Sequence, residues 1–259
     1  MKLGIVIPYR NAENWIGRCL ESIKGEFVIF PVNDNSLDQS REIVHELAEQ
    51  DKRITPIDSE GRGVSAARNR GLDLAFMAEC DYISFLDSDD TYAADAYYSY
   101  KAAIKASGGA DLIQLNHLRV MPDGSRRSRL YSPGGIYELP HMPRLWVSSC
   151  NKLFKMDLIQ NIRFDENLTH GEDELFVLEC LKRTRKIFSS EYIALEYRKD
   201  NPNSLSSSTS FVELLNEQLA LRNFLYLNKE DPELCEAVRL RQVELWQNAT
   251  YKRVIGRIS

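Results

Sequence analysis

The stretch Leu3–Ile23, LGIVIPYRNAENWIGRCLESI, decides the fold class of this chain. Its first residues, Leu3 to Ile7, form a continuous apolar run that predicts a buried strand. Apolar residues then recur at helical spacing, at Trp15, Ile16, Cys19, Leu20 and Ile23. The stretch is therefore expected to form a strand followed by a helix, the unit from which parallel sheets are built.

The same alternation repeats through the first hundred residues of the chain. Strands are expected at 27–32, 54–57 and 82–86, and helical patterns run through 43–47 and 64–78. Alternating strand–helix units predict a mainly parallel sheet with helices on both faces. Ligands of such sheets bind beyond the carboxyl ends of the strands, so the functional residues are sought there.

Beyond residue 108 the alternation loosens, which predicts a mixed rather than a parallel arrangement. Two strand patterns, 110–120 and 126–130, flank the turn sequence Pro122-Asp123-Gly124 and predict a hairpin. A polar loop or hinge is expected at 204–210, followed by helices at 211–228 and 232–258. The expected division is therefore 1–108, 109–207 and a helical extension, 208–259.

Composition excludes several classes of function. The net charge of −5 over 259 residues argues against a general nucleic-acid binder, which needs a basic surface. The five cysteines form no CxxC pair, so neither a disulfide framework nor a zinc site is expected, and a reducing cytoplasm fits best. No charged leader and no apolar run long enough to span a membrane is seen, so a cytoplasmic protein is expected.

The ends of the predicted strands carry unusual residues. The first strand runs into Pro8-Tyr9-Arg10-Asn11, without the glycine-rich loop that holds a pyrophosphate through backbone amides. The apolar run 82–86 leads into Asp87-Ser88-Asp89-Asp90. Alternation along an extended chain places Asp87 and Asp89 on one side, where they could address a hard divalent cation. Such a cation would supply the missing charge compensation for a diphosphate.

Two alternatives for the aspartate cluster stay open. It could be an Asp-rich turn whose side chains satisfy local backbone amides. It also fits the motif of haloacid-dehalogenase-like phosphatases, with Asp87 as nucleophile and Asp89 as acid/base. Those enzymes usually carry the motif on their first strand, whereas here three strand–helix units precede it.

Arg68 lies in the middle of a helical stripe of small residues and is expected to face inward. The stripe consists of Val64, Ala67, Arg68, Gly71, Ala75 and Ala78. A guanidinium near a sheet end could bind phosphate through its planar fork. It could equally form a buried ion pair with a nearby aspartate.

The segment Thr169-His170-Gly171-Glu172-Asp173 is expected to open a helix. Thr169 and Glu172 have the spacing of a capping box, and acids in a first helical turn are favoured by the helix dipole. Asp173, however, shares a stripe with apolar residues further along the helix, so it could face a cleft and act in catalysis. The pattern does not exclude Glu174 for that role.

As a set, these residues resemble the glycosyltransferases of family 2, which share the GT-A fold. The resemblance runs from about Leu3 to Ser206. It rests on the stretches 6–11, 32–36, 63–71, 87–90, 151–154 and 171–174, together with Tyr197, Arg198 and Ser204. It implies an α/β GT-A fold, Rossmann-like, with a mainly parallel mixed sheet and flanking helices. Residues 1–108 would bind the nucleotide, residues 109–207 would bind the acceptor, and residues 208–259 would be a C-terminal extension.

The resemblance also implies roles for individual residues. Pro8 and Tyr9 would line the nucleotide pocket, and Asp34 would hydrogen-bond the base, most often uracil. Relatives usually read DDGS where this chain reads Asn33-Asp34-Asn35-Ser36, so the base preference is less firmly implied.

Further implied roles concern the sugar diphosphate. Arg68 would lie beside the base and phosphates, and Asp87 and Ser88 would contact the nucleotide. Asp89 would coordinate Mn²⁺ or Mg²⁺. Asp173 would be the catalytic base of an inverting transfer, and Arg198 would belong to a segment that orders over the donor.

The implied reaction moves a sugar from a nucleotide-diphosphate donor, with a UDP-sugar favoured, to a glycan or a lipid-linked glycan. The chain lacks the QxxRW motif of processive synthases, so a single addition is expected. A catalytically silent nucleotide-sugar binder is the alternative. The last helix, with Arg239, Arg241, Lys252, Arg253 and Arg257, has a basic amphipathic pattern. It could touch the inner face of a membrane, form a homodimer, or pack on the catalytic domain.

Overall fold

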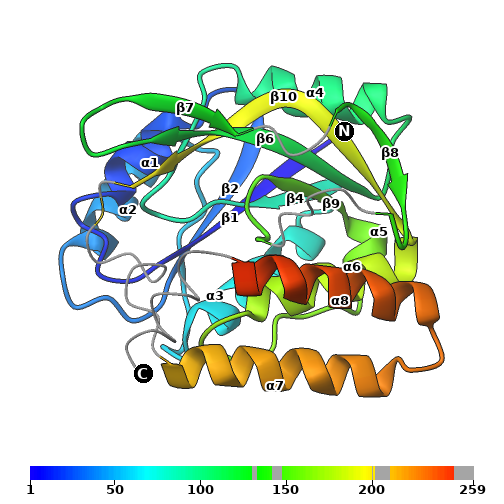
Figure 1. Cartoon of the computed structure of the whole chain (residues 1–259). Coiled ribbons are helices and arrows are strands. Elements are labelled where there is room, and N and C mark those ends of the chain that lie inside the picture. Colours follow the sequence, from blue (N-terminus) through cyan, green and yellow to red (C-terminus); the bar gives the residue numbers. More distant parts are fainter. Residues whose placement is uncertain (130–132, 142–147, 200, 202–210, 248–259) are drawn as a thin grey trace.

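The fold is described from a computed structural model, which describes residues 1–129, 133–141, 148–199, 201 and 211–247. Its centre is a ten-stranded mixed sheet with the main strand order β3-β2-β1-β4-β9-β6-β10-β5. Two further strands pair beside this path, β7 with β6 and β8 with β10. The expected α/β architecture is confirmed (Figure 1).

The first hundred residues form the parallel portion of the sheet, as predicted. Strand β1 (Leu3–Tyr9) lies between β2 (Phe27–Asn33) and β4 (Tyr82–Phe85), and both pairings are parallel. The strand expected at 54–57 is shorter and shifted, because β3 contains only Ile57–Asp58. Ile54 makes a single isolated bridge to Ile29 instead. The intervening helices are α1 (Ile16–Ser22), α2 (Ser40–Gln50) and α3 (Val64–Met77).

The portion of the sheet beyond residue 108 is mixed, as expected. Strand β9 (Lys152–Lys155) is antiparallel to β4 and to β6 (Leu112–Val120), while β10 (Lys186–Arg198) is parallel to β6. The predicted hairpin is confirmed by β7 (Arg126–Arg129), which pairs antiparallel with β6. The short strands β5 (Thr91–Tyr92) and β8 (Gly135–Glu138) pair antiparallel with β10.

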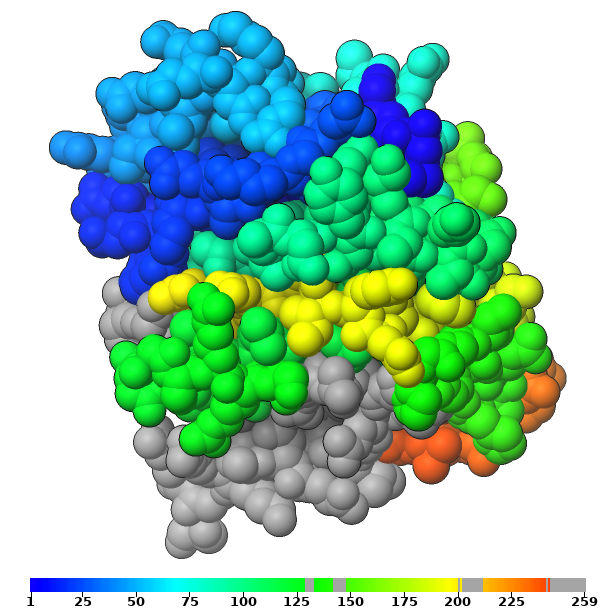
Figure 2. Space-filling view, turned by 90° about the horizontal axis from the view of Figure 1, so that it is seen from above, coloured from blue at the N-terminus to red at the C-terminus, as the bar shows by residue number. Residues whose placement is uncertain are grey.

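Helices cover both faces of the sheet (Figure 1). Helix α4 (Ala96–Ala106) packs on β6 and β10 from one side, and α3 packs on β1, β2 and β4. Helix α6 (Glu172–Thr184) lies on the other side from α4 and follows α5 (Met156–Ile159). Helices α7 (Phe211–Leu227) and α8 (Pro232–Gln247) pack on α6. Figure 2 shows β10 crossing the face between α4 and the β7 and β8 segments.

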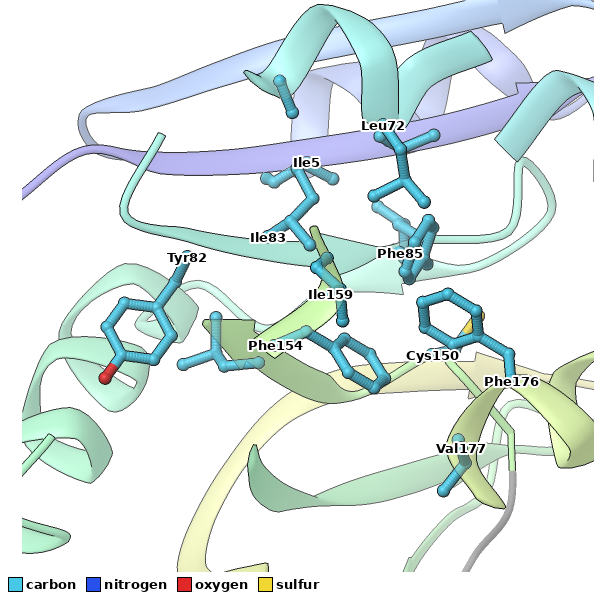
Figure 3. Close-up of a cluster of buried hydrophobic side chains, with 14 of the residues drawn as sticks. Ile5, Leu72, Tyr82, Ile83, Phe85, Cys150, Phe154, Ile159, Phe176 and Val177 are labelled. Atoms are coloured by element: carbon cyan, nitrogen blue, oxygen red, sulfur yellow. The ribbon is translucent and has the colours of Figure 1, made fainter. Parts of the chain in front are cut away.

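An aromatic cluster fills the space between the sheet and α6 (Figure 3). The ring of Phe85 meets those of Phe154 and Phe176 edge-on, with centroids 5.8 Å apart in both pairs. Phe164 stacks on Phe176 with centroids 4.0 Å apart. Aromatic pairs of this kind add about 0.5–1.5 kcal/mol beyond the burial of their area. This packing places the first turn of α6 near the end of β4.

The strand directions bring one set of strand ends together. Because β9 is antiparallel to both β4 and β6, the latter two run in the same direction, and β10 runs with β6. The carboxyl ends of β1, β2, β4, β6 and β10 therefore share one edge of the sheet. Most of the residues singled out in the sequence lie at this edge.

Candidate functional site

The ends of β1 and β2 form one wall of the site. Pro8 lies opposite Val32 in the parallel register, and the backbone N–H of Asp34 donates to the carbonyl of Tyr9 at 2.8 Å. Tyr9 is buried, and burial raises the pKa of its phenol. Pro8, Tyr9 and Asp34 are thus brought together, with the backbone joining them.

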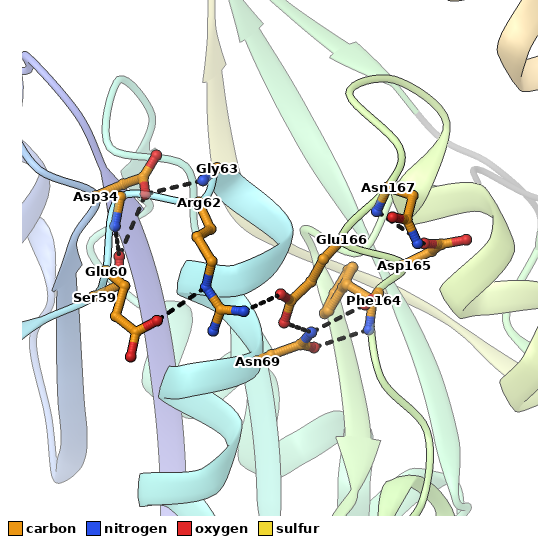
Figure 4. Close-up of polar contacts among 11 residues, drawn as sticks. Asp34, Ser59, Glu60, Arg62, Gly63, Asn69, Phe164, Asp165, Glu166 and Asn167 are labelled. Carbon is orange, nitrogen blue, oxygen red and sulfur yellow. Dashed lines mark hydrogen bonds and ion pairs between the residues drawn. The ribbon is translucent and has the colours of Figure 1, made fainter.

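Asp34 is buried and holds the loop that leads into α3 (Figure 4). Its Oδ1 accepts from the backbone N–H of Gly63 at 3.1 Å and from the Ser59 hydroxyl at 3.3 Å. Gly63 has a positive φ of 98°, and a β-carbon there would meet nothing within 4 Å. The loop is therefore shaped by backbone conformation, with open space beside Gly63. The other carboxylate oxygen of Asp34, Oδ2, lies 3.8 Å from Nη1 of Arg10.

The same loop is tied to the segment before α6. Arg62 pairs with Glu166, with Nη1 and Oε2 3.2 Å apart, as Figure 4 shows. Asn69 on α3 donates to the Phe164 carbonyl at 3.0 Å and accepts from the Phe164 N–H at 2.9 Å. These contacts connect the wall formed by the ends of β1 and β2 to the segment that leads into α6.

The aspartate cluster follows β4 and divides into three environments. Asp87 accepts from Arg68 at 3.1 Å, and the Asp89 carboxylate accepts from the Asn201 amide at 2.8 Å. Asp90 is 1% exposed and accepts from the backbone N–H of Arg198 at 2.7 Å. Burial raises the pKa of Asp90 well above its ordinary value, and the neighbouring aspartates add to the rise.

Ser88 lies half-buried between Asp87 and Asp89. The backbone of Arg198, at the end of β10, is joined to the cluster through Asp90. The alternative of an Asp-rich turn, in which side chains satisfy local backbone amides, does not explain these contacts. The carboxylates of Asp87, Asp89 and Asp90 contact residues at least 19 positions away along the chain.

Arg68 faces inward, as predicted, and its side chain is 4% exposed. Its guanidinium contacts three carboxylates, at 2.8 Å to Glu172, 3.1 Å to Asp87 and 3.2 Å to Asp173. The buried ion pair that the sequence left as an alternative is therefore present. Arg68 joins the end of β4 to the first turn of α6.

Helix α6 starts differently from the expected capping box. Its N-cap is Gly171, with a left-handed φ of 81°, and no side chain caps the helix through a hydrogen bond. The capping-box prediction for Thr169 and Glu172 was wrong because Glu172 turns to Arg68 instead. Spacing alone could not reveal this contact, since 104 residues separate the two partners.

Asp173 lies in the same turn and points into the site. Its side chain is 20% exposed, and its Oδ2 accepts from the Ser148 hydroxyl at 3.3 Å. Glu174, the other acid considered, is 3% exposed. Asp173 is therefore the more accessible of the two.

The residues at this edge supply carboxylates for a divalent cation but do not form a complete set of ligands. Within the described residues of the chain, no three side chains from His, Cys, Asp and Glu converge on one point. Four carboxylates nevertheless contact the Arg68 guanidinium or the Asn201 amide, and that of Asp90 contacts the backbone N–H of Arg198, so the site is rich in negative charge. Mg²⁺ is commonly held by one or two carboxylates together with substrate phosphates. Asp89, half-buried in this cluster, offers one such carboxylate.

Comparison with known families identifies the chain. The family model described as "Glycosyl transferase family 2" matches residues 4–160, the region that contains β1 to β9 and the aspartate cluster. The chain belongs to glycosyltransferase family 2. This assignment favours the glycosyltransferase interpretation of the aspartate cluster over the phosphatase.

A similar protein is a teichoic acid poly(glycerol phosphate) polymerase of Staphylococcus epidermidis, 34% identical over 195 residues. The match covers 71% of this chain and 26% of that protein. The chain thus spans about a quarter of this relative's length.

Solved structures of glycosyltransferases share the fold. TarS 1–349 of S. aureus, in complex with UDP-GlcNAc, has a TM-score of 0.72 at 23% identity, over 87% of this chain and 67% of that one. A mannosyltransferase of Pyrobaculum calidifontis, in complex with GDP-Man and Mn²⁺, has a TM-score of 0.62 at 12% identity, over 98% and 72%. The GT-A expectation is confirmed.

The structure of α7 and α8 tests the prediction of a basic amphipathic helix at the C-terminal end. Leu234 and Val238 of α8 are buried, and α8 packs on α6 and α7, which agrees with the packed alternative. Arg239 is exposed. Lys252, Arg253 and Arg257 lie outside the described residues, as does the side chain of Arg241. No helix within the described ranges is long and apolar enough to cross a membrane.

Proposed function

We propose that this member of family 2 is an inverting glycosyltransferase that moves a sugar from a UDP-sugar to an acceptor hydroxyl. The acceptor would be a glycan or a lipid-linked glycan, and the enzyme would act in the cytoplasm, peripherally at the inner face of the cell membrane where the acceptor is lipid-linked. The printed name of the S. epidermidis relative, a polymerase of a cell-wall polymer, supports an acceptor of this class.

One observation carries the proposal. Arg68 contacts both Asp87, beside the proposed cation ligand Asp89, and Asp173, the proposed base. The donor end and the acceptor end of a transfer reaction would therefore meet at one guanidinium. A nucleotide binder without catalysis would have no evident need for Asp173 at this position.

On the nucleotide side, Asp34 would accept a hydrogen bond from the uracil ring. Pro8 and Tyr9 would line the pocket, and Asp87 and Ser88 would contact the nucleotide. Arg198 would lie over the donor, because the backbone contact with Asp90 holds it beside the cluster. Arg68 would favour the charge that develops on the departing diphosphate.

On the acceptor side, Asp173 would take the proton of the attacking hydroxyl. The new bond joins the acceptor oxygen to the anomeric carbon, the bond from that carbon to the diphosphate oxygen breaks, and the nucleoside diphosphate departs. Ser148 and Arg68 contact the two carboxylate oxygens of Asp173 and orient them.

Asp89 would hold the divalent cation, Mn²⁺ or Mg²⁺. When bound, this ion neutralises charge on the diphosphate leaving group. The Mn²⁺ in the P. calidifontis neighbour's complex is consistent with this assignment.

The proposal is tested by calorimetric titration of UDP, GDP and CDP, with and without Mn²⁺. We expect UDP to bind more tightly with Mn²⁺, and Asp89→Ala to lose the effect of the metal because the ligand carboxylate is gone. Asp95→Ala, at an exposed position before α4, is the matched control. Absence of any metal-dependent nucleotide binding in the wild type would refute the proposed donor site.

The role of Asp173 has its own test. With the donor sugar identified, Asp173→Asn should lower kcat by a factor of about 10²–10⁴, the usual contribution of a general base. UDP affinity should change much less than kcat, because Asp173 is proposed as the base and not as a ligand of the nucleotide. A near-normal kcat in this variant would show that another group takes the proton.

A further inference from the structure

The first turn of α6, which carries Asp173, lies against a buried glutamate of α7. Glu217 is 5% exposed, and its Cγ would lie 2.6 Å from a β-carbon built on Gly171. Only glycine fits at position 171, both for this reason and because of its positive φ of 81°. The Glu217 side chain therefore rests directly on the backbone that starts α6.

Glu217 also contacts the preceding residue. Its Oε2 lies 3.4 Å from Nε2 of His170, and the two side chains are 6% and 31% exposed. One side chain of α7 thus holds the two residues that come before Glu172 and Asp173. A carboxylate beside a helix N-terminus is also favoured by the helix dipole.

The far end of α6 is held by the same helical pair. Arg185, the C-cap residue, pairs with both Asp231 and Glu233 at the start of α8. Leu221 and Leu234, from α7 and α8, are buried in the common hydrophobic core. Helix α6 is therefore fixed at both ends by α7 and α8, and Glu217 is the contact next to the catalytic turn.

We propose that Glu217 is a positioning residue for Asp173, and that α7 is in this way part of the catalytic apparatus. The inference rests on the proposed role of Asp173. Glu217 fixes His170 and Gly171, and these set the direction in which the Asp173 carboxylate enters the site. Displacement of a catalytic group by about 1 Å can cost roughly a hundredfold in rate.

The first test compares Glu217→Ala and Glu217→Gln with wild type. We expect Glu217→Ala to lower kcat by about tenfold to a hundredfold while the Kd for UDP stays unchanged, since the Asp34 wall does not depend on α7. Glu217→Gln keeps the packing on Gly171 and loses only the charge, so it should recover most of the rate. An unchanged kcat in Glu217→Ala would overturn the proposal.

The second test asks whether the effect passes through Asp173. In an Asp173→Asn background, Glu217→Ala should cause no further loss of kcat, because the group being positioned is already absent. The same fold-loss in both backgrounds would show that Glu217 acts by another route.

A third measurement does not depend on activity. Amide hydrogen exchange in residues 168–175 should become faster in Glu217→Ala, because the turn loses its support. Arg185→Ala, at the opposite end of α6, is the matched control and should lower Tm without that local effect. Unchanged exchange in residues 168–175 would overturn the proposal even if the chain showed no transfer. An active Asp173→Asn enzyme would instead count against the proposed function.

Discussion

Arg68 shows how far one residue can be understood from its position in a pattern. Its place in a stripe of small residues predicts an inward-facing side chain, and this is confirmed. The pattern left a phosphate ligand and an ion pair as alternatives, and the structure shows ion pairs to Asp87 and Asp173. A role beside the phosphates stays a prediction.

Glu172 was missed as a site residue. Its spacing from Thr169 matches a capping box, a local explanation that is sufficient on its own. The actual partner, Arg68, comes from a different helix. Burial and the neighbouring Asp173 raise the pKa of Glu172, against the opposing effect of Arg68. One guanidinium among three carboxylates compensates only some of their charge.

The raised pKa leads to a prediction about stability and pH. The folded state holds the Glu172 proton more tightly than the unfolded state, so this contribution is fully present below the ordinary pKa of about 4.3. It is lost as pH rises from there through the higher folded pKa. Glu172→Gln does not titrate, so its Tm relative to wild type should increase steadily as pH rises from 4.

Thermal unfolding followed by circular dichroism at a series of pH values measures this difference. Glu46→Gln, at an exposed position on α2, controls for the general effect of removing one negative charge. A Tm difference between Glu172→Gln and wild type that is independent of pH would mean that Glu172 ionises alike in both states.

Helix α3 brings Arg68 to the carboxyl ends of the strands because the helix packs closely on β1. A β-carbon at Gly71 would lie 2.4 Å from Cγ1 of Val6, so this glycine permits the contact between helix and strand. The stripe of small residues seen in the sequence corresponds to this packing. Gly17 in α1 has a different environment, since a β-carbon there would meet only Ile43, at 3.6 Å.

This pair of glycines gives opposite predictions for the same substitution. Gly71→Ala should destabilise the protein by about 1–3 kcal/mol, because overpacking outweighs the gain of about 1 kcal/mol in helix propensity. Gly17→Ala should instead stabilise it, by up to about 1 kcal/mol, since ordinary van der Waals contact leaves only the propensity gain. Urea unfolding measures both. Equal changes of the same sign would show that the α3–β1 contact can relax.

The sequence predicted strands correctly where the apolar runs are long, and the prediction failed at the short run 54–57. The runs that became β1, β2 and β4 lie within one or two residues of their expected bounds. The expected strand at 54–57 is reduced to Ile57–Asp58 with one bridge at Ile54, because β3 lies at the edge of the sheet and pairs only with β2.

For the whole molecule, the C-terminal helices are integrated with the rest. Leu214, Leu221 and Phe224 of α7 belong to the same hydrophobic cluster as the strands of the sheet. The division into 1–207 and an extension, 208–259, stays a prediction. Residues 211–247 share their hydrophobic core with the preceding residues, and Glu217 contacts the turn that carries Asp173.

The sequence by itself determined the α/β class, the parallel first half of the sheet, the mixed second half, and the family. Patterns along the chain singled out Arg68, the aspartate cluster and Asp173, because these follow apolar runs or interrupt helical stripes, and the family resemblance added Asp34. These patterns depend only on residues that are close along the chain, so the periodicity of the sequence shows them directly.

Only the tertiary structure decided which of these residues meet. The contacts of Arg68 with Glu172 and Asp173, of Asp89 with Asn201, and of Glu217 with His170 join segments that are far apart along the chain or belong to different helices. They depend on strand order and on the angle at which helices pack. Those are properties of the assembled core, since local periodicity shows which face of an element is buried but not which distant segment covers it.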